Sequence, residues 1–198
     1  MIGRARPLMT APRFTPLAAA LIGAAGGAVD WLAAQIWPAS IAVVLSIFAT
    51  TLLSGAAGLG AARAADLSSV GFVFGVLVKY SALMALSAAN LPFALPANLS
   101  LGFILIAGFA ASRALTVSAS KPVTHADVGI ALAIGFAPAA LIGIPGLAGL
   151  AAAIVARMLF AAYVRRGPRV FTAAALETTA QLTEVCFYLG ALATWAYI

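Results

Sequence analysis

The stretch that decides the fold is IAVVLSIFATTLLSGAAGLGAARAAD, which runs from Ile41 to Asp66. Its first half is an unbroken apolar run, and its second half is a Gly/Ala segment that follows Ser54 and ends in Arg63 and Asp66. An integral membrane enzyme would place its reacting groups where such a helix delivers small and polar residues to one face of the bilayer. Ser54 and Asp66 are therefore candidate site residues, although few other chemical groups lie in this stretch.

Composition places the whole chain in lipid. Of the 198 residues, 64% are hydrophobic and 8% are charged, and the mean hydropathy is +1.11. A soluble domain has about 25% charged residues. Backbone groups in lipid must bond internally, which allows helices or a closed barrel. The apolar runs are long and continuous rather than alternating, so they predict helices.

Seven apolar runs are each near the roughly 20 residues that a helix needs to cross a bilayer. They lie at residues 17–37, 39–59, 70–90, 97–115, 128–144, 147–164 and 172–197. We therefore expect an all-α, polytopic transmembrane helical bundle of about seven spans, in a single domain at residues 17–198. Residues 1–16 are rich in arginine and proline, which favours a cytoplasmic leader; a secretory signal peptide is the second interpretation.

The net charge of +6 is distributed by loop. Basic residues lie in the leader, near Arg63, and in the loops at residues 113–127 and 165–169, whereas the intervening loops are uncharged. By the positive-inside rule this pattern predicts a cytoplasmic N-terminus and a multi-pass protein of the bacterial inner membrane, with its functional loops facing the cytoplasm. Basic residues are not interleaved with aromatic ones in a stripe, so nucleic acid is a poor candidate partner.

Two of the charged residues interrupt the early spans. Lys79 lies near the middle of its span, the most costly position for an unpaired cation. We expect it to form a structural ion pair with Asp30, Glu177 or Glu184. For Asp30 itself, a position near the lipid head groups is favoured over a buried functional acid, because Trp31 beside it is typical of the membrane interface.

The last span carries a polar stripe. Glu177, Gln181 and Glu184 are four and three residues apart, which places them on one face of a helix. Two carboxylates in an apolar span must face the bundle interior. The stripe either binds an ion or substrate, or is hydrogen-bonded to Lys79, Arg157 or hydroxyl groups of neighbouring helices. The residues leave these two interpretations equally open.

The run RRGPRVFTAAALETTAQLTE, from Arg165 to Glu184, resembles the C-terminal signature of the cobalamin synthase family, the adenosylcobinamide-GDP ribazoletransferases. The positions that match in one register are Arg165, Arg166, Thr172, Leu176, Gln181, Leu182, Thr183 and Glu184. The opening FTPLAAALIG, the segment LLSGA that contains Ser54, the segment LVKYSAL that contains Lys79, and the pair Ser112-Arg113 also resemble the family, in the same order.

The resemblance implies a cytoplasm-facing membrane enzyme of the last step of cobalamin synthesis. Such an enzyme joins α-ribazole, or its 5′-phosphate, to adenosylcobinamide-GDP and releases GMP with Mg²⁺. Its partners would be the lipid bilayer, the nucleotide-activated corrinoid and α-ribazole, with a homo- or hetero-oligomer also possible. Residues that match the family pattern and would serve such an enzyme are Arg113, Arg165 and Arg166 as phosphate-binding groups, Glu184 as an acid–base group, and Ser54, Lys79, Thr172 and Gln181 as further polar candidates. Asp66 and Glu177 are the other acidic candidates for acid–base chemistry, and Asp66 is the candidate metal ligand, although Asp66 aligns with a family aspartate only if the register slips by one.

This chain departs from the family where the family has its metal-binding acids. After LLSGA the family has a run rich in Asp and Glu, whereas Gly58, Leu59, Gly60 and Ala64 stand there in this sequence. Two further hypotheses therefore stay open. One is a non-catalytic paralogue that acts as a membrane scaffold or partner subunit. The other is a small transporter or channel that uses charged residues within the spans as a polar path; these are Asp30, Lys79, Glu177 and Glu184.

Overall fold

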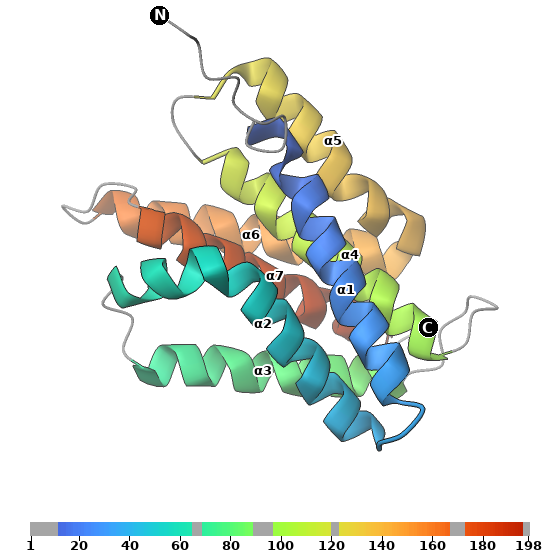
Figure 1. Cartoon of the computed structure of the whole chain (residues 1–198). Coiled ribbons are helices and arrows are strands. Elements are labelled where there is room, and N and C mark those ends of the chain that lie inside the picture. The colour runs from blue at the N-terminus through green and yellow to red at the C-terminus, as the bar shows by residue number, and fades with distance from the viewer. Residues whose placement is uncertain (1–11, 65–68, 89–96, 120–122, 167–172, 196–198) are drawn as a thin grey trace, which may run out of the picture.

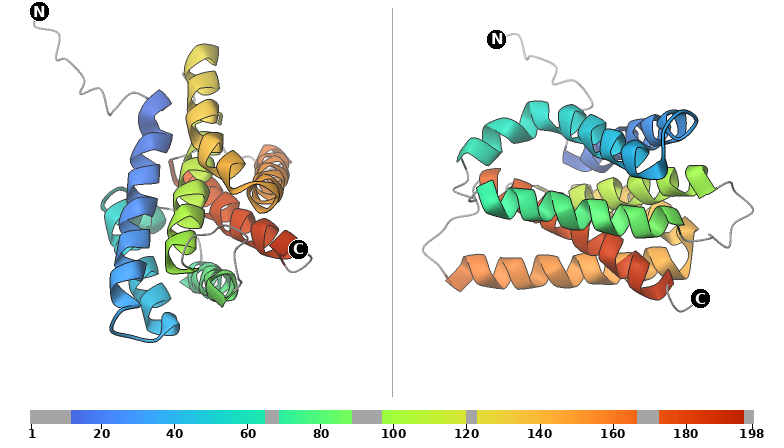
Figure 2. Two further views of the ribbon diagram at one scale, coloured as in Figure 1. Left: turned by 90° about the vertical axis from the view of Figure 1, so that its right-hand side faces the viewer. Right: turned by 90° about the horizontal axis from the view of Figure 1, so that it is seen from below.

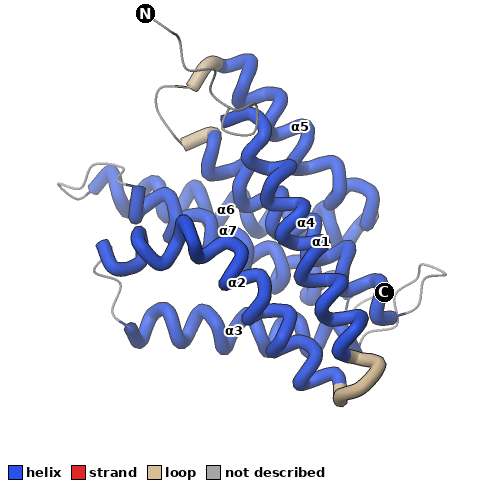
Figure 3. Tube along the Cα trace, in the orientation of Figure 1, coloured by secondary structure: helices blue, strands red, loops and turns tan. Residues whose placement is uncertain are grey.

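The computed structural model describes the backbone of residues 12–64, 69–88, 97–119, 123–166 and 173–195, and the side chains of a slightly narrower set. Within these ranges the chain is all-α and contains no strand (Figure 3). A short 3₁₀ turn, η2, precedes seven α-helices. The elements are η2 Pro12–Phe14, α1 Thr15–Ala33, α2 Ala39–Ala64, α3 Ser69–Ala88, α4 Ala97–Val117, α5 His125–Ile142, α6 Ile144–Arg166 and α7 Ala173–Trp195.

Each predicted span corresponds to one helix, with ends displaced by a few residues, and the boundary between the fifth and sixth helices has a clear structural cause. The sequence predicted that the fifth and sixth helices separate at Pro145-Gly146. Instead α5 ends at Ile142 and α6 begins at Ile144, with Gly143 between them at a φ of 83°. A positive φ after a helix favours glycine, and Pro145 is accommodated in the first turn of α6, where its missing N–H has no intrahelical acceptor to lose.

The helices do not share one direction. When α1, α4 and α5 stand upright, α3 and α6 are seen nearly end-on (Figure 2). By length and composition, three helices can cross a membrane: Pro12–Ala33, His125–Ile142 and Ile144–Val164. The described parts of α2, α3 and α4 contribute shorter apolar segments. The described part of the chain is thus all-helical and has three helices that are long and apolar enough to span a membrane, while the number of about seven spans stays a prediction.

The central helix is α4, which lies between α1 and α5 on one side and α7 on the other (Figure 1). Its contact with α1 is unusually close because small residues meet there. A Cβ added at Gly27 would lie 2.5 Å from Cα of Gly102, and one at Gly23 would lie 2.8 Å from Cα of Ile106. Close backbone approach of this kind replaces the hydrophobic effect as a source of helix association in lipid.

The helix α2 changes direction along its length (Figure 1). Three hydroxyl side chains before the bend donate to backbone carbonyls of their own helix: Thr50 to Ser46 O and Ile47 O, both at 3.0 Å, Thr51 to Ile47 O at 2.7 Å, and Ser54 to Thr51 O at 3.3 Å. Such bonds compete with the helical ladder and bend helices. They also satisfy the hydroxyl groups that the apolar helix brings into the interior.

Large apolar side chains cover the outer surface. Examples that are more than half exposed occur on α1, α2, α3, α5 and α6: Leu21, Phe48, Phe74, Leu141 and Leu159. So much exposed apolar surface is not stable in water but is suited to lipid chains. The composition-based prediction of a lipid environment therefore agrees with how the side chains are distributed in the fold.

Candidate functional site

The candidate site is a small pocket enclosed by α2, α3, α4 and α7. Its volume is about 30 Å³, which holds water but not a nucleotide. It is lined by Ile47, Thr51, Ser54, Gly75, Val76, Lys79, Phe109, Arg113, Glu177, Ala180, Gln181, Glu184 and Val185. In a chain with 8% charged residues, two cations and two carboxylates thus meet in one pocket.

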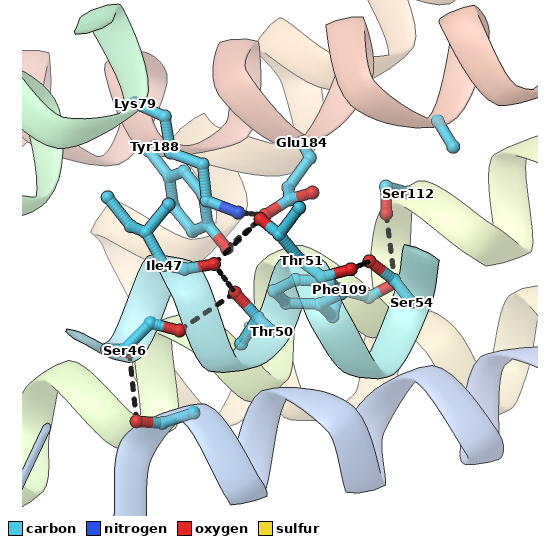
Figure 4. A network of polar contacts seen from close by, with 12 residues as sticks. Ser46, Ile47, Thr50, Thr51, Ser54, Lys79, Phe109, Ser112, Glu184 and Tyr188 are labelled. Atoms are coloured by element: carbon cyan, nitrogen blue, oxygen red, sulfur yellow. Dashed lines mark hydrogen bonds and ion pairs between the residues drawn. The ribbon is translucent and has the colours of Figure 1, made fainter. Parts of the chain in front are cut away.

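The inner part of the pocket holds a buried ion pair. Nζ of Lys79 lies 2.6 Å from Oε1 of Glu184, and both side chains are about one-tenth exposed. The hydroxyl of Tyr188 donates to the same carboxylate oxygen at 2.9 Å, and the Lys79 ammonium lies 4.7 Å from the ring centroid of Phe109 (Figure 4). The carboxylate and the aromatic face together stabilise a charge that would otherwise be costly inside the bundle.

The outer part of the pocket holds a second ion pair, between α4 and α7. Nη1 of Arg113 donates to Oε2 of Glu177 at 2.7 Å, and Nη2 donates to Oε1 at 2.9 Å. The pair is therefore bidentate, the strongest arrangement of these groups. Its side chains are 22% and 17% exposed, about twice as much as those of the inner pair.

The predicted stripe on the last helix is confirmed, because Glu177, Gln181 and Glu184 all line the pocket. The predicted pairing of Lys79 with one of the acids is also confirmed, with Glu184 as its partner. Arg157, the other basic candidate, donates from its Nε to the carbonyl of Leu115 on α4 at 3.0 Å.

Asp30 is buried within the bundle, since it is 4% exposed. The adjacent Trp31, 42% exposed, is the residue of the two that faces outward. Neighbouring positions of a helix point in different directions, so an outward-facing Trp31 is compatible with a buried Asp30. The position of Asp30 near the lipid head groups stays a prediction.

The pocket brings together only part of the predicted site. Ser54 lines it and bonds to the backbone of its own helix. The predictions at Asp66, Arg165, Arg166 and Thr172 concern side chains that lie outside those the structure describes. Two contributing residues were missed: Phe109, one turn before Arg113, and Tyr188, one turn after Glu184. Extending each charged face by one helical turn would have found both.

The described residues show no cluster of metal-ligating side chains. No three acidic, histidine or cysteine side chains are grouped within the described part of the chain. Mg²⁺ binds one or two carboxylates together with waters and substrate phosphates. Here Glu177 and Glu184 are occupied by Arg113 and Lys79, respectively. The expectation of Mg²⁺ consequently rests on the resemblance alone.

Known relatives decide the family. The adenosylcobinamide-GDP ribazoletransferase of Leptothrix cholodnii is 30% identical to this chain over 228 residues, a match that covers 91% of this chain and 84% of the relative. This chain belongs to the adenosylcobinamide-GDP ribazoletransferase family. A second ribazoletransferase, from Ralstonia nicotianae, is 32% identical over 135 residues, covering 56% of this chain and 50% of that relative. No protein-family model and no solved structure matches the chain.

This chain is a divergent ribazoletransferase-family member. The longer alignment has 228 positions against the 198 residues of this chain, so the Leptothrix ribazoletransferase contains residues with no counterpart here. The resemblance to the cobalamin synthase family predicted from the LLSGA and Arg165-to-Glu184 segments is therefore confirmed.

Proposed function

We propose that this protein is a membrane-embedded transferase that joins α-ribazole, or its 5′-phosphate, to adenosylcobinamide-GDP in the final step of cobalamin synthesis. In this reaction a ribose hydroxyl oxygen forms a bond to the phosphorus next to the corrinoid. The bond from that phosphorus to GMP breaks, GMP leaves with the electron pair, and the hydroxyl gives up its proton. The observation that carries the proposal is the pocket of paired charges in a chain of this family.

The chemistry requires positive groups near the phosphates. Phosphoryl transfer depends mainly on positioning and on neutralising charge on the transferred group. Arg113 supplies a planar guanidinium at the outer part of the pocket, a group suited to phosphate oxygens. Lys79 supplies a second positive charge deeper between the helices.

The proposed proton acceptor is Glu184. A general base must lie within hydrogen-bond reach of the attacking hydroxyl. Lys79 and Tyr188 both bond to Oε1 of Glu184, which fixes the orientation of the carboxylate. Figure 4 shows the second oxygen of this carboxylate without a partner among the residues drawn. Gln181 and Ser54 line the same pocket and are proposed to position the substrates.

Other parts of the proposal follow from the resemblance. Arg165, Arg166 and Thr172 are expected to add phosphate contacts at the cytoplasmic face, and Asp66 is expected to be an acid–base group or a metal ligand. We propose a multi-pass protein of the bacterial inner membrane with a cytoplasmic N-terminus, in accord with the distribution of basic loops. Mg²⁺, an oligomer and the partition into a leader at 1–16 and a membrane domain at 17–198 remain expectations.

A specific observation favours one second candidate, a non-catalytic membrane subunit. Each pocket carboxylate is paired with a cation, and such pairs can serve purely to hold helices together. The transporter hypothesis receives less support. It required a polar path that includes Asp30, whereas the pocket contains Lys79, Glu177 and Glu184 but not Asp30.

The proposal is tested by GMP release from adenosylcobinamide-GDP and α-ribazole, with purified protein in dodecyl maltoside, with and without Mg²⁺. We expect release by the wild-type chain and a loss of about 100-fold or more in Glu184→Gln, because general-base catalysis contributes about 10²–10⁴-fold. Ser81→Ala, an exposed change on the same helix as Lys79, is the control. A folded, monodisperse protein that releases no GMP would instead be the non-catalytic subunit.

A further inference from the structure

The Arg113–Glu177 pair has the geometry of a guanidinium bound to a phosphate. Both nitrogens of the fork are used, at 2.7 and 2.9 Å from the two carboxylate oxygens. A phosphate presents two oxygens to the same fork in the same bidentate manner. Glu177 therefore occupies the position in which an anionic ligand of Arg113 would bind.

The pair also controls access. The pocket volume is about 30 Å³, and Arg113 and Glu177 lie at its more exposed part. A phosphate group with its ester needs more room than a few water positions. Because Arg113 belongs to α4 and Glu177 to α7, separating the two side chains opens space between these helices and frees the two guanidinium donors of Arg113.

We propose that Glu177 is a built-in competitor for the anionic ligand of Arg113, so that ligand binding requires the guanidinium to exchange the Glu177 carboxylate for a phosphate group. This inference rests on the proposed function, because it assumes that Arg113 binds substrate phosphate. It assigns Glu177 a role opposite to that of an acid–base residue: its carboxylate weakens binding, and its removal strengthens it.

The inner pair does not exchange in this way. Glu184 is bonded by two donors from different residues, Lys79 and Tyr188, and Phe109 contacts the Lys79 ammonium. Its side chains are also only about half as exposed as those of the outer pair. Opening it would leave buried charges without partners, which is much more costly than opening a partly hydrated pair. The outer pair is thus the one that a ligand can separate.

The test measures binding of inorganic diphosphate and of GMP by calorimetry, with the full-length protein in dodecyl maltoside at fixed ionic strength. When a closed state competes with the ligand, the apparent affinity equals the intrinsic affinity multiplied by the fraction of protein in which the pair is open. A pair that is closed about nine-tenths of the time therefore weakens binding about tenfold. We expect Glu177→Gln to bind diphosphate about tenfold more tightly than wild type. Glu177→Asp keeps the negative charge on a shorter side chain, so its diphosphate affinity should increase by less than that of Glu177→Gln. This variant provides the test if Glu177→Gln does not fold.

Two controls separate competition from charge. Asp127→Asn changes the net charge by the same amount at a carboxylate that contacts Arg13 and Thr124, not the pocket, and should leave diphosphate affinity unchanged. Arg113→Gln combined with Glu177→Gln removes both members of the pair and should lose the gain. An equal increase in Asp127→Asn, or an unchanged or weaker affinity in both Glu177 variants, would overturn the inference.

Phosphate could also come from a lipid head group, which the same measurement resolves. If added phosphatidylglycerol lowers diphosphate affinity in wild type and Glu177→Gln alike, both ligands use Arg113, and the lipid is the competing source. The outcomes also separate this inference from the proposed function. Tighter binding in Glu177→Gln without GMP release by either protein supports the anion site and refutes the transferase. GMP release together with equal diphosphate affinities of wild type and Glu177→Gln supports the transferase and refutes the competition by Glu177. If neither diphosphate nor GMP binds to any variant and no GMP is released, both proposals are refuted.

Discussion

Replacing Lys79 by methionine tests how the bundle tolerates its inner ion pair. Methionine keeps the length of the side chain but removes the cation, so Glu184 loses its 2.6 Å partner. Removing one member of a buried pair destabilises proteins by about 3–5 kcal/mol, because the remaining charge stays buried. The side chains here are about one-tenth exposed and line a small pocket that is large enough to admit water, so we expect a value near the lower end, about 3 kcal/mol.

Adding Glu184→Gln to Lys79→Met should restore much of this loss. The double variant holds no unpaired charge, and the glutamine oxygen can still accept the hydrogen bond that Tyr188 donates at 2.9 Å. We expect a recovery of about 2 kcal/mol, within the range of coupling energies between contacting residues. The cation–π contact between Lys79 and Phe109 stays lost, which limits the recovery.

The assay is reversible unfolding in dodecyl maltoside followed by circular dichroism, for wild type, both single variants and the double variant. Ser81→Ala, on the exposed side of α3, is the control and should change stability by less than about 0.5 kcal/mol. If the double variant is no more stable than Lys79→Met, the loss does not come from an uncompensated Glu184, and the account of the pocket as a pair of balanced charges is refuted.

Three further predictions concern other contacts. Gly27→Ala should lower the free energy of unfolding by about 1–3 kcal/mol, because the added methyl group overpacks against Gly102. Gly129→Ala is the control and should cause no such loss, because a Cβ there meets no heavy atom within 4 Å. Equal losses of stability in thermal melts would contradict the close α1–α4 contact. Thr124→Ala removes the cap on the Asp127 N–H and should lower stability by about 1 kcal/mol in the same melts, while an unchanged melting temperature would show that the cap is dispensable. In Arg113→Lys the ammonium group cannot form the bidentate contact that the guanidinium makes, so diphosphate should bind about fivefold more weakly or worse. An unchanged diphosphate affinity in calorimetry would exclude Arg113 as the anion site.

The sequence predicted the parts of this structure that depend on local patterns. The seven apolar runs became α1 to α7 with ends displaced by a few residues. The spacing of Glu177, Gln181 and Glu184 predicted a shared face correctly because helical periodicity is a local property. The cost of burying Lys79 predicted an ion pair, since a cation within lipid must find a partner wherever one is in reach.

The choice of partners depended on packing that no local pattern contains. Arg113 and Arg157 are both basic residues within apolar helices, yet Arg113 forms the bidentate pair with Glu177 whereas Arg157 donates to the carbonyl of Leu115. That outcome follows from how α4 is rotated against α7, which the whole bundle determines. The steep crossing of α3 and α6 relative to α1, α4 and α5 (Figure 2) was likewise invisible, because apolar runs of similar length carry no information about direction.

Charge balance explains why the pocket can exist within lipid and what a ligand must supply. The two cations and two carboxylates that line it sum to zero, so the pocket needs no counterion. A bound diphosphate would add negative charge at Arg113 and displace Glu177, which leaves the pocket with an excess of negative charge. Stable binding therefore requires further cations, and Arg165 and Arg166, the phosphate-binding residues predicted from the family signature, are the candidates. Replacing both by glutamine should abolish the gain in affinity expected for Glu177→Gln, since an unpaired Arg113 alone cannot offset the charge of the ligand and the displaced groups around it.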